Sequence, residues 1–118
     1  MAKGIKTMKN FRDRFWALRE EMIEYIKKAI ETCGKGVKEI DLMEIEYDNC
    51  PIISDSGDDE TTFVLDKITI TDKGLLVFEG SSSWKNGSWD ENIISTDALY
   101  NICNEIDYIV QYAKNYKD

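Results

Sequence analysis

Histidine is absent from this sequence. Imidazole is the base in Ser-His-Asp and Cys-His nucleophilic sites, and it is the commonest protein ligand for metals. Its absence therefore excludes from this chain the nucleophilic sites and the metal sites that depend on an imidazole. Carboxylate chemistry is not excluded, because the chain contains 23 aspartate and glutamate residues.

Cysteine is scarce as well. Cys33, Cys50 and Cys103 are the three cysteines, they lie far apart, and no Cys-x-x-Cys pair occurs. A disulfide framework in a small secreted protein uses an even number of cysteines. Cys33 and Cys103 lie among periodic apolar residues and are expected to be small core side chains rather than metal ligands. The thiols favour a reducing compartment, so we expect a cytoplasmic protein.

Signals for membranes and cofactors are also missing. No apolar run approaches the ~20 residues that a membrane-spanning helix needs. The N-terminal residues are charged and lack the apolar stretch of a secretory signal. No Gly-rich phosphate loop of the P-loop or dinucleotide type occurs. We therefore predict no cofactor, no metal site and no membrane partner.

Negative charge dominates, but it is unevenly distributed. The net charge is −8, whereas residues 1–19 contain six basic residues and one acidic residue. Those residues carry +5, so the remainder carries −13. A basic arm over residues 1–8 on an acidic body can contact nucleic acid, another protein or its own acidic face. The acidic remainder repels phosphates, which argues against nucleic acid as the partner.

Two long helices are predicted, one near each end of the chain. Residues 9–33 repeat apolar side chains at steps of three and four, the spacing of one helix face, at Phe11, Phe15, Leu18, Met22, Ile26, Ala29 and Cys33. Gly34 and Gly36 follow and are typical of a helix end. A second helix runs to Tyr116 from Ser95 or Thr96, both good N-capping residues.

Three strands are predicted between the helices, over residues 38–48, 62–71 and 75–84, with a short fourth strand over 89–93 as an option. In the first strand the apolar parity changes after Leu42, so either both faces are partly covered or a bulge intervenes. Residues 49–61 are predicted to form a solvated acidic loop. The α-β-β-β-α order predicts one α+β domain over residues 1–118, with both helices on one face of a three- to four-stranded antiparallel sheet.

The segment Asp72-Lys73-Gly74 predicts a tight hairpin with glycine at positive φ. That turn sets a register in which Lys67 lies opposite Glu79, a favourable cross-strand pair. The same alternation places Asp66 on the core face. A buried carboxylate without a partner is a candidate catalytic group, unless it lies at a wet sheet end or another side chain satisfies it. No second group is positioned to act with Asp66, so we predict no catalytic residues.

Two of the three tryptophans lie in SSSWKNGSWDE, residues 81–91. Its Asn86-Gly87 pair predicts a two-residue type I′ turn, which places Trp84 directly opposite Trp89. Either the indoles cover the end of the core, or the hairpin projects past the core. In the second case Trp84 and Trp89 form a contact patch beside Lys85, because tryptophan is enriched where proteins bind one another.

Two further surfaces are candidates for partner binding. The first predicted strand carries a row of acids that includes Glu44 and Glu46. That row either protects an edge strand or faces a basic partner. The last helix carries Tyr108, Tyr112 and Tyr116 one turn apart. These tyrosines form either the margin of the core or a surface for a dimer or another partner.

The order of elements and the acidic surface resemble small bacterial chaperone and immunity-type proteins, without any shared motif. Missing catalytic machinery, uneven charge and aromatics in polar surroundings favour a non-enzymatic module that binds an unidentified protein or forms a homodimer. The alternative is a nucleic-acid-related role. That role would use either direct binding by the basic arm or mimicry of DNA by the acidic face.

Overall fold

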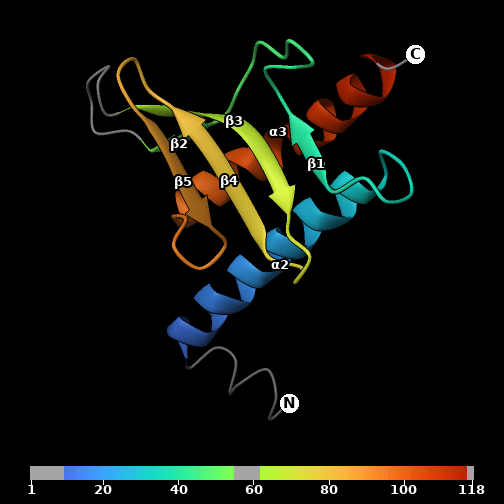
Figure 1. Ribbon diagram of the computed structural model, residues 1–118. Coiled ribbons are helices and arrows are strands. Elements are labelled where there is room, and N and C mark those ends of the chain that lie inside the picture. The colour runs from blue at the N-terminus through green and yellow to red at the C-terminus, as the bar shows by residue number, and fades with distance from the viewer. Residues whose placement is uncertain (1–9, 55–61, 117–118) are drawn as a thin grey trace.

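A computed structural model describes residues 10–54 and 62–116 (Figure 1). Along the chain the elements are α2 (Phe11–Glu31), β1 (Glu39–Asp41), β2 (Ile52–Ser54), β3 (Phe63–Ile70), β4 (Leu76–Ser81), β5 (Asn86–Asp90) and α3 (Thr96–Tyr116). The strands form one open antiparallel sheet, and the two helices pack on one of its faces. The predicted α+β class is confirmed, with five strands in place of three or four.

The sheet has the order β1-β3-β4-β5, and β2 also pairs with β3. The strands β1 and β2 lie one after the other along the same edge of β3, because β1 pairs with Lys67–Thr69 and β2 pairs with the Phe63 end. The opposite edge is β5. One core joins the helices to this sheet and contains the fully buried side chains of Ile26, Ile68, Phe78, Leu99, Ile102 and Ile106, among others.

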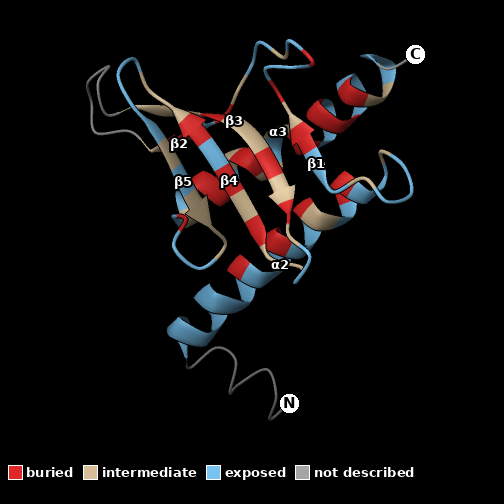
Figure 2. Ribbon diagram, viewed as in Figure 1, coloured by how far each residue is buried: buried red, intermediate tan, exposed pale blue. Residues whose placement is uncertain are grey.

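The first predicted helix is confirmed, but only part of its apolar stripe enters the core. Asn10 caps α2, because its side-chain oxygen accepts a hydrogen bond from the backbone nitrogen of Asp13 at 3.1 Å. The buried positions begin at Arg19 and continue through Ile30. Before Arg19 the helix is exposed along its whole length, which Figure 2 shows as a pale blue end that extends past the sheet.

The first predicted strand, residues 38–48, is wrong beyond Asp41. The strand β1 ends at Asp41, whose carboxylate accepts hydrogen bonds from the backbone nitrogens of Met43 at 3.0 Å and Glu44 at 3.1 Å. A compact turn follows, in which Glu46 has a φ of +57°. This turn buries Leu42 and Ile45 together. The change of apolar parity therefore marks a turn rather than a bulge or a strand covered on both faces.

The predicted loop over residues 49–61 contains a strand. Residues Ile52–Ser54 form β2, which pairs with the start of β3. Ile53 is buried in the core, and the backbone nitrogen of Leu65 donates to the carbonyl oxygen of Pro51 at 2.8 Å. The rest of the predicted loop, residues 55–61, and the predicted basic arm, residues 1–8, lie outside the described residues.

The predicted register of β3 and β4 is correct at the turn and wrong at Asp66. Ile68 pairs with Phe78, and Lys67 lies opposite Glu79 with 3.8 Å between its ammonium and the carboxylate. A bulge at Asp66 then shifts the register. Leu65 takes the fully buried position, while Asp66 is partly exposed. The prediction that Asp66 lies on the core face is therefore wrong.

Replacing Gly74 with valine is expected to lower the free energy of unfolding by more than about 1 kcal/mol. Gly74 has a φ of +82°, and a Cβ there would meet no atom within 4 Å, so backbone strain alone causes the loss. Urea unfolding measures it. Lys73→Val is the matched control, because Lys73 is exposed in the same turn without a positive φ. Equal losses for both variants would contradict the argument from backbone strain.

Candidate interaction surface

The hairpin of two tryptophans has a longer loop than predicted. Ser81 pairs with Asn86 and Phe78 with Trp89, so residues 82–85 form the loop and Asn86-Gly87 belongs to β5. The hydroxyl of Ser82 accepts hydrogen bonds from the backbone nitrogens of Trp84 at 3.3 Å and Lys85 at 3.1 Å. The prediction of a type I′ turn at Asn86-Gly87 is therefore wrong.

Gly87 serves the packing of Trp89 rather than a turn. A Cβ on Gly87 would lie 2.6 Å from Cη2 of the Trp89 indole. That indole also meets the Phe63 ring edge-on, with 5.2 Å between the ring centroids, and it packs against the core. Trp84 is instead 75% exposed at the tip of the loop, beside exposed Lys85. The two indoles are not cross-strand partners, and only Trp84 remains on the surface.

The other predicted binding residues are exposed in separate places. Glu44 and Glu46 lie in the turn after β1, not in a row along a strand. On α3, Tyr108, Tyr112 and Tyr116 are each more than 40% exposed. Tyr112 also meets Tyr47 edge-on at 5.4 Å. The tyrosine stripe is thus a surface feature of α3, and its Tyr112 lies near the turn that carries the acids, because Glu44 lines one hollow with Ala113 and Lys114.

Arg19 is a structural residue that the sequence pattern does not identify. It is 4% exposed and is the buried charged residue of the described core. Its guanidinium donates hydrogen bonds to the Thr96 hydroxyl at 2.9 Å, the Glu91 carbonyl at 3.1 Å and the Ile94 carbonyl at 2.7 Å. Its Nε is buried with no hydrogen-bond partner among the described residues. Arg19 therefore fixes α2 to the connection between β5 and α3.

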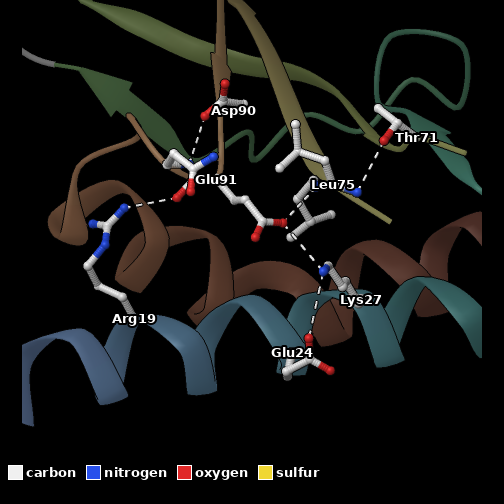
Figure 3. Close-up of polar contacts among 9 residues, drawn as sticks. Arg19, Glu24, Lys27, Thr71, Leu75, Asp90 and Glu91 are labelled. Atoms are coloured by element: carbon white, nitrogen blue, oxygen red, sulfur yellow. Dashed lines mark hydrogen bonds and ion pairs between the residues drawn. The ribbon is translucent and has the colours of Figure 1, made fainter. Parts of the chain in front are cut away.

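A second polar contact joins α2 to the same connection about two turns after Arg19, between Lys27 and Glu91 (Figure 3). The Glu91 carboxylate accepts a hydrogen bond from the backbone nitrogen of Leu76 at 2.8 Å and lies 3.4 Å from the Lys27 ammonium. Lys27 also pairs with Glu24 at 3.7 Å. Arg19 and Lys27 thus join the same connection to α2 at two levels, so the helix cannot slide along the sheet without breaking both contacts.

The helices α2 and α3 run parallel to each other, side by side. The Cys103 thiol donates a hydrogen bond to the Met22 carbonyl at 3.6 Å. About one turn further along both helices, the Tyr25 hydroxyl donates to the Asp107 carboxylate at 2.5 Å, so residue numbers increase in the same direction along both helices. The Arg19 side chain reaches Thr96, the first residue of α3. Because each residue of a helix advances 1.5 Å, the exposed residues 11–18 span about 12 Å of helix ahead of this contact.

We call residues 11–18 of α2 the projecting segment. Phe15 and Trp16 meet edge-on with 5.9 Å between their centroids, and the Arg14 guanidinium lies 5.2 Å from the centre of the Phe11 ring. The segment carries four large apolar side chains that are about half exposed or more: Phe11 (74%), Phe15 (47%), Trp16 (50%) and Leu18 (48%). The sequence assigned Phe11, Phe15 and Leu18 to the core, and their exposure corrects that prediction.

The described residues offer little for metal binding. No three cysteine, aspartate or glutamate side chains among them gather closely enough to hold a metal ion. In residues 10–54 and 62–116, neither long helix has the length and apolar content needed to cross a membrane.

Replacing Arg19 with methionine is expected to lower the free energy of unfolding by about 2–4 kcal/mol, because two main-chain carbonyls and one hydroxyl lose a charged donor. Chemical denaturation measures the loss. Arg12→Met is the control, because Arg12 lies on the exposed part of the same helix. If the two variants were equally stable, Arg19 would not anchor α2.

Burial and the hydrogen bond from its hydroxyl to Glu105 raise the pKa of Tyr47 from 10.0 to about 12. The neutral phenol is therefore favoured in the folded state. Its stabilisation is complete below pH 10 and is lost as the pH rises toward 12. The difference in the free energy of unfolding between wild type and Tyr47→Phe should narrow between about pH 10 and about pH 12. Tyr108→Phe, on exposed α3 surface, is the control, and a pH-independent gap for Tyr47→Phe would contradict the prediction.

Comparisons with protein families, curated proteins and solved structures find no match to this chain. The surfaces of this fold are Trp84, the acidic turn after β1, the tyrosine stripe of α3 and the projecting segment. Of these, the projecting segment combines several apolar side chains on one helix with a position outside the packed body.

Proposed function

We propose that this protein is a protein–protein interaction module whose main contact surface is the projecting segment of α2. The observation that carries the proposal is the exposure of Phe11, Phe15, Trp16 and Leu18 on two adjacent helical turns. Aromatic side chains cover about 150–250 Å² each when buried. The segment therefore exposes on the order of 400 Å² of apolar surface, which is in the range of functional patches on monomers.

The remaining exposed aromatics support this choice less strongly. Trp84 is a single indole at a loop tip, and isolated exposed apolar residues are ordinary on protein surfaces. The tyrosines of α3 have polar hydroxyls, so contact with water costs them little. The projecting segment lacks that compensation. Phe11, Phe15 and Leu18 have no polar side-chain atom, and Trp16 has only its indole nitrogen.

A nucleic-acid-related role is the alternative. The open face of the sheet carries Glu39, Glu79 and Asp41, which could imitate a row of phosphates. Lys67 lies between the first two, 3.6 Å from Glu39 and 3.8 Å from Glu79, and neutralises part of that row. Arg19, one of the six cations of residues 1–19, is buried and cannot contact phosphates. Both observations favour the protein–protein proposal.

Site-specific photo-crosslinking tests the proposed function. A photoreactive phenylalanine analogue placed at Phe15, in the native host, is expected to give a discrete crosslinked species of higher mass. The same analogue at Lys28, which is exposed at the other end of α2, is the matched control and should give none. Equal crosslinking at both positions, or none at Phe15, would contradict the proposal.

A further inference from the structure

We infer that the occupant of the projecting segment is a second copy of this chain, held in an antiparallel pair of α2 helices. The inference rests on the proposed function and names its partner. It follows from the spacing of the apolar side chains, from the order of charges beside them, and from the area that the segment exposes.

The exposed apolar side chains of the segment repeat at coiled-coil spacing. Phe11, Phe15 and Leu18 are separated by four and then three residues, and Met22 follows after four more, where the helix enters the core. Such a seam packs knobs into holes against a matching helix. In an antiparallel pair, Phe15 of each copy packs beside Leu18 of the other on both sides of a two-fold axis, so the contact closes as a dimer.

The charges beside this seam are self-complementary in one orientation. Arg14 and Glu21 lie seven residues apart, two helical turns, on the same flank of α2, and both are exposed. In an antiparallel pair each Arg14 lies near Glu21 of the second copy, which gives two ion pairs related by symmetry. In a parallel pair Arg14 would instead lie beside the position five residues further along the second copy, which is Arg19, another cation. Flanking charges of this kind set the orientation of helix pairs.

Other occupants fit this pattern less well. An anionic membrane surface would attract Arg12 and Arg14, but it would repel Glu20, Glu21 and the body of the protein, because residues 20–118 carry −13. A second copy instead matches the change from basic to acidic residues along the helix, since each end of the pair brings opposite charges together.

The exposed area is that of a small interface, which is typical of weak, reversible contacts. Trp16 lies about 100° round the helix from Phe15 and outside the seam. Phe11, Phe15 and Leu18 of two copies supply on the order of 600 Å² of apolar surface, and flanking side chains leave the total at or below the lower limit of about 1,200 Å² for specific interfaces. We therefore expect a reversible dimer with a dissociation constant in the micromolar range, about 1–100 μM.

Charge exchange tests the inference. Sedimentation equilibrium of the full chain should show a monomer–dimer equilibrium in the wild type. Arg14→Glu and Glu21→Arg should each weaken dimerisation by about tenfold or more, because each places like charges together twice. Mixing these two variants should restore a dimer, since both cross-pairs are then of opposite charge, and the variant carrying both changes should dimerise alone. Lys28→Glu is the control and should leave the dissociation constant unchanged.

Folding does not obscure the result, because a glutamate near the start of a helix favours the helix, and circular dichroism of each variant verifies it. Single variants that dimerise like wild type, or a mixture that remains monomeric, would overturn the inference. A wild-type chain that stays monomeric would overturn it too, while crosslinks from Phe15 to a different protein would leave the proposed function intact. Flotation of the monomer with vesicles of anionic lipid would also overturn it, in favour of a membrane surface.

Discussion

The buried guanidinium of Arg19 is the contact on which the arrangement of helices and sheet depends. A charged group removed from water needs acceptors, or its desolvation costs several kcal/mol. Among the described residues Arg19 has no carboxylate partner, and its acceptors are two carbonyls and a hydroxyl from the connection that leads into α3. The connection and α2 are therefore ordered together, because neither satisfies the guanidinium alone.

This anchor also decides which part of α2 belongs to the core. Arg19 is the first buried residue of α2, so the positions that enter the core follow it and the exposed residues 11–18 precede it. Lys27 and Glu91 repeat the same attachment further along the helix. The apolar stripe of α2 is therefore exposed before Arg19, at Phe11, Phe15 and Leu18, and buried after it, at Met22 and Ile26.

Periodicity was sufficient to predict both helices, two of the strands and the turn at Gly74, because each of these is determined by neighbours in the chain. The pairing of Lys67 with Glu79 followed from that turn. The bulge at Asp66 and the short strand β2 depend on contacts between distant residues, and no local pattern specifies them. The end of β1 is local, because the Asp41 carboxylate accepts from the backbone of Met43 and Glu44, but the row of apolar and acidic residues favoured a continued strand. Asn86-Gly87 was misleading because Gly87 leaves room for the Trp89 indole. A glycine required for side-chain packing cannot be distinguished in the sequence from a glycine required by a turn.

The candidate site was missed for a related reason. Helical spacing says which side chains share a face, but it does not say where the covering element ends, so Phe11 and Ile26 are equivalent in the sequence although one is 74% exposed and the other fully buried. The signal that could have separated them is charge. Arg14 beside the exposed half and Glu21 beside the buried half make the stripe complementary to itself in reverse, a pattern that packing inside one chain does not require and that a second, antiparallel helix does.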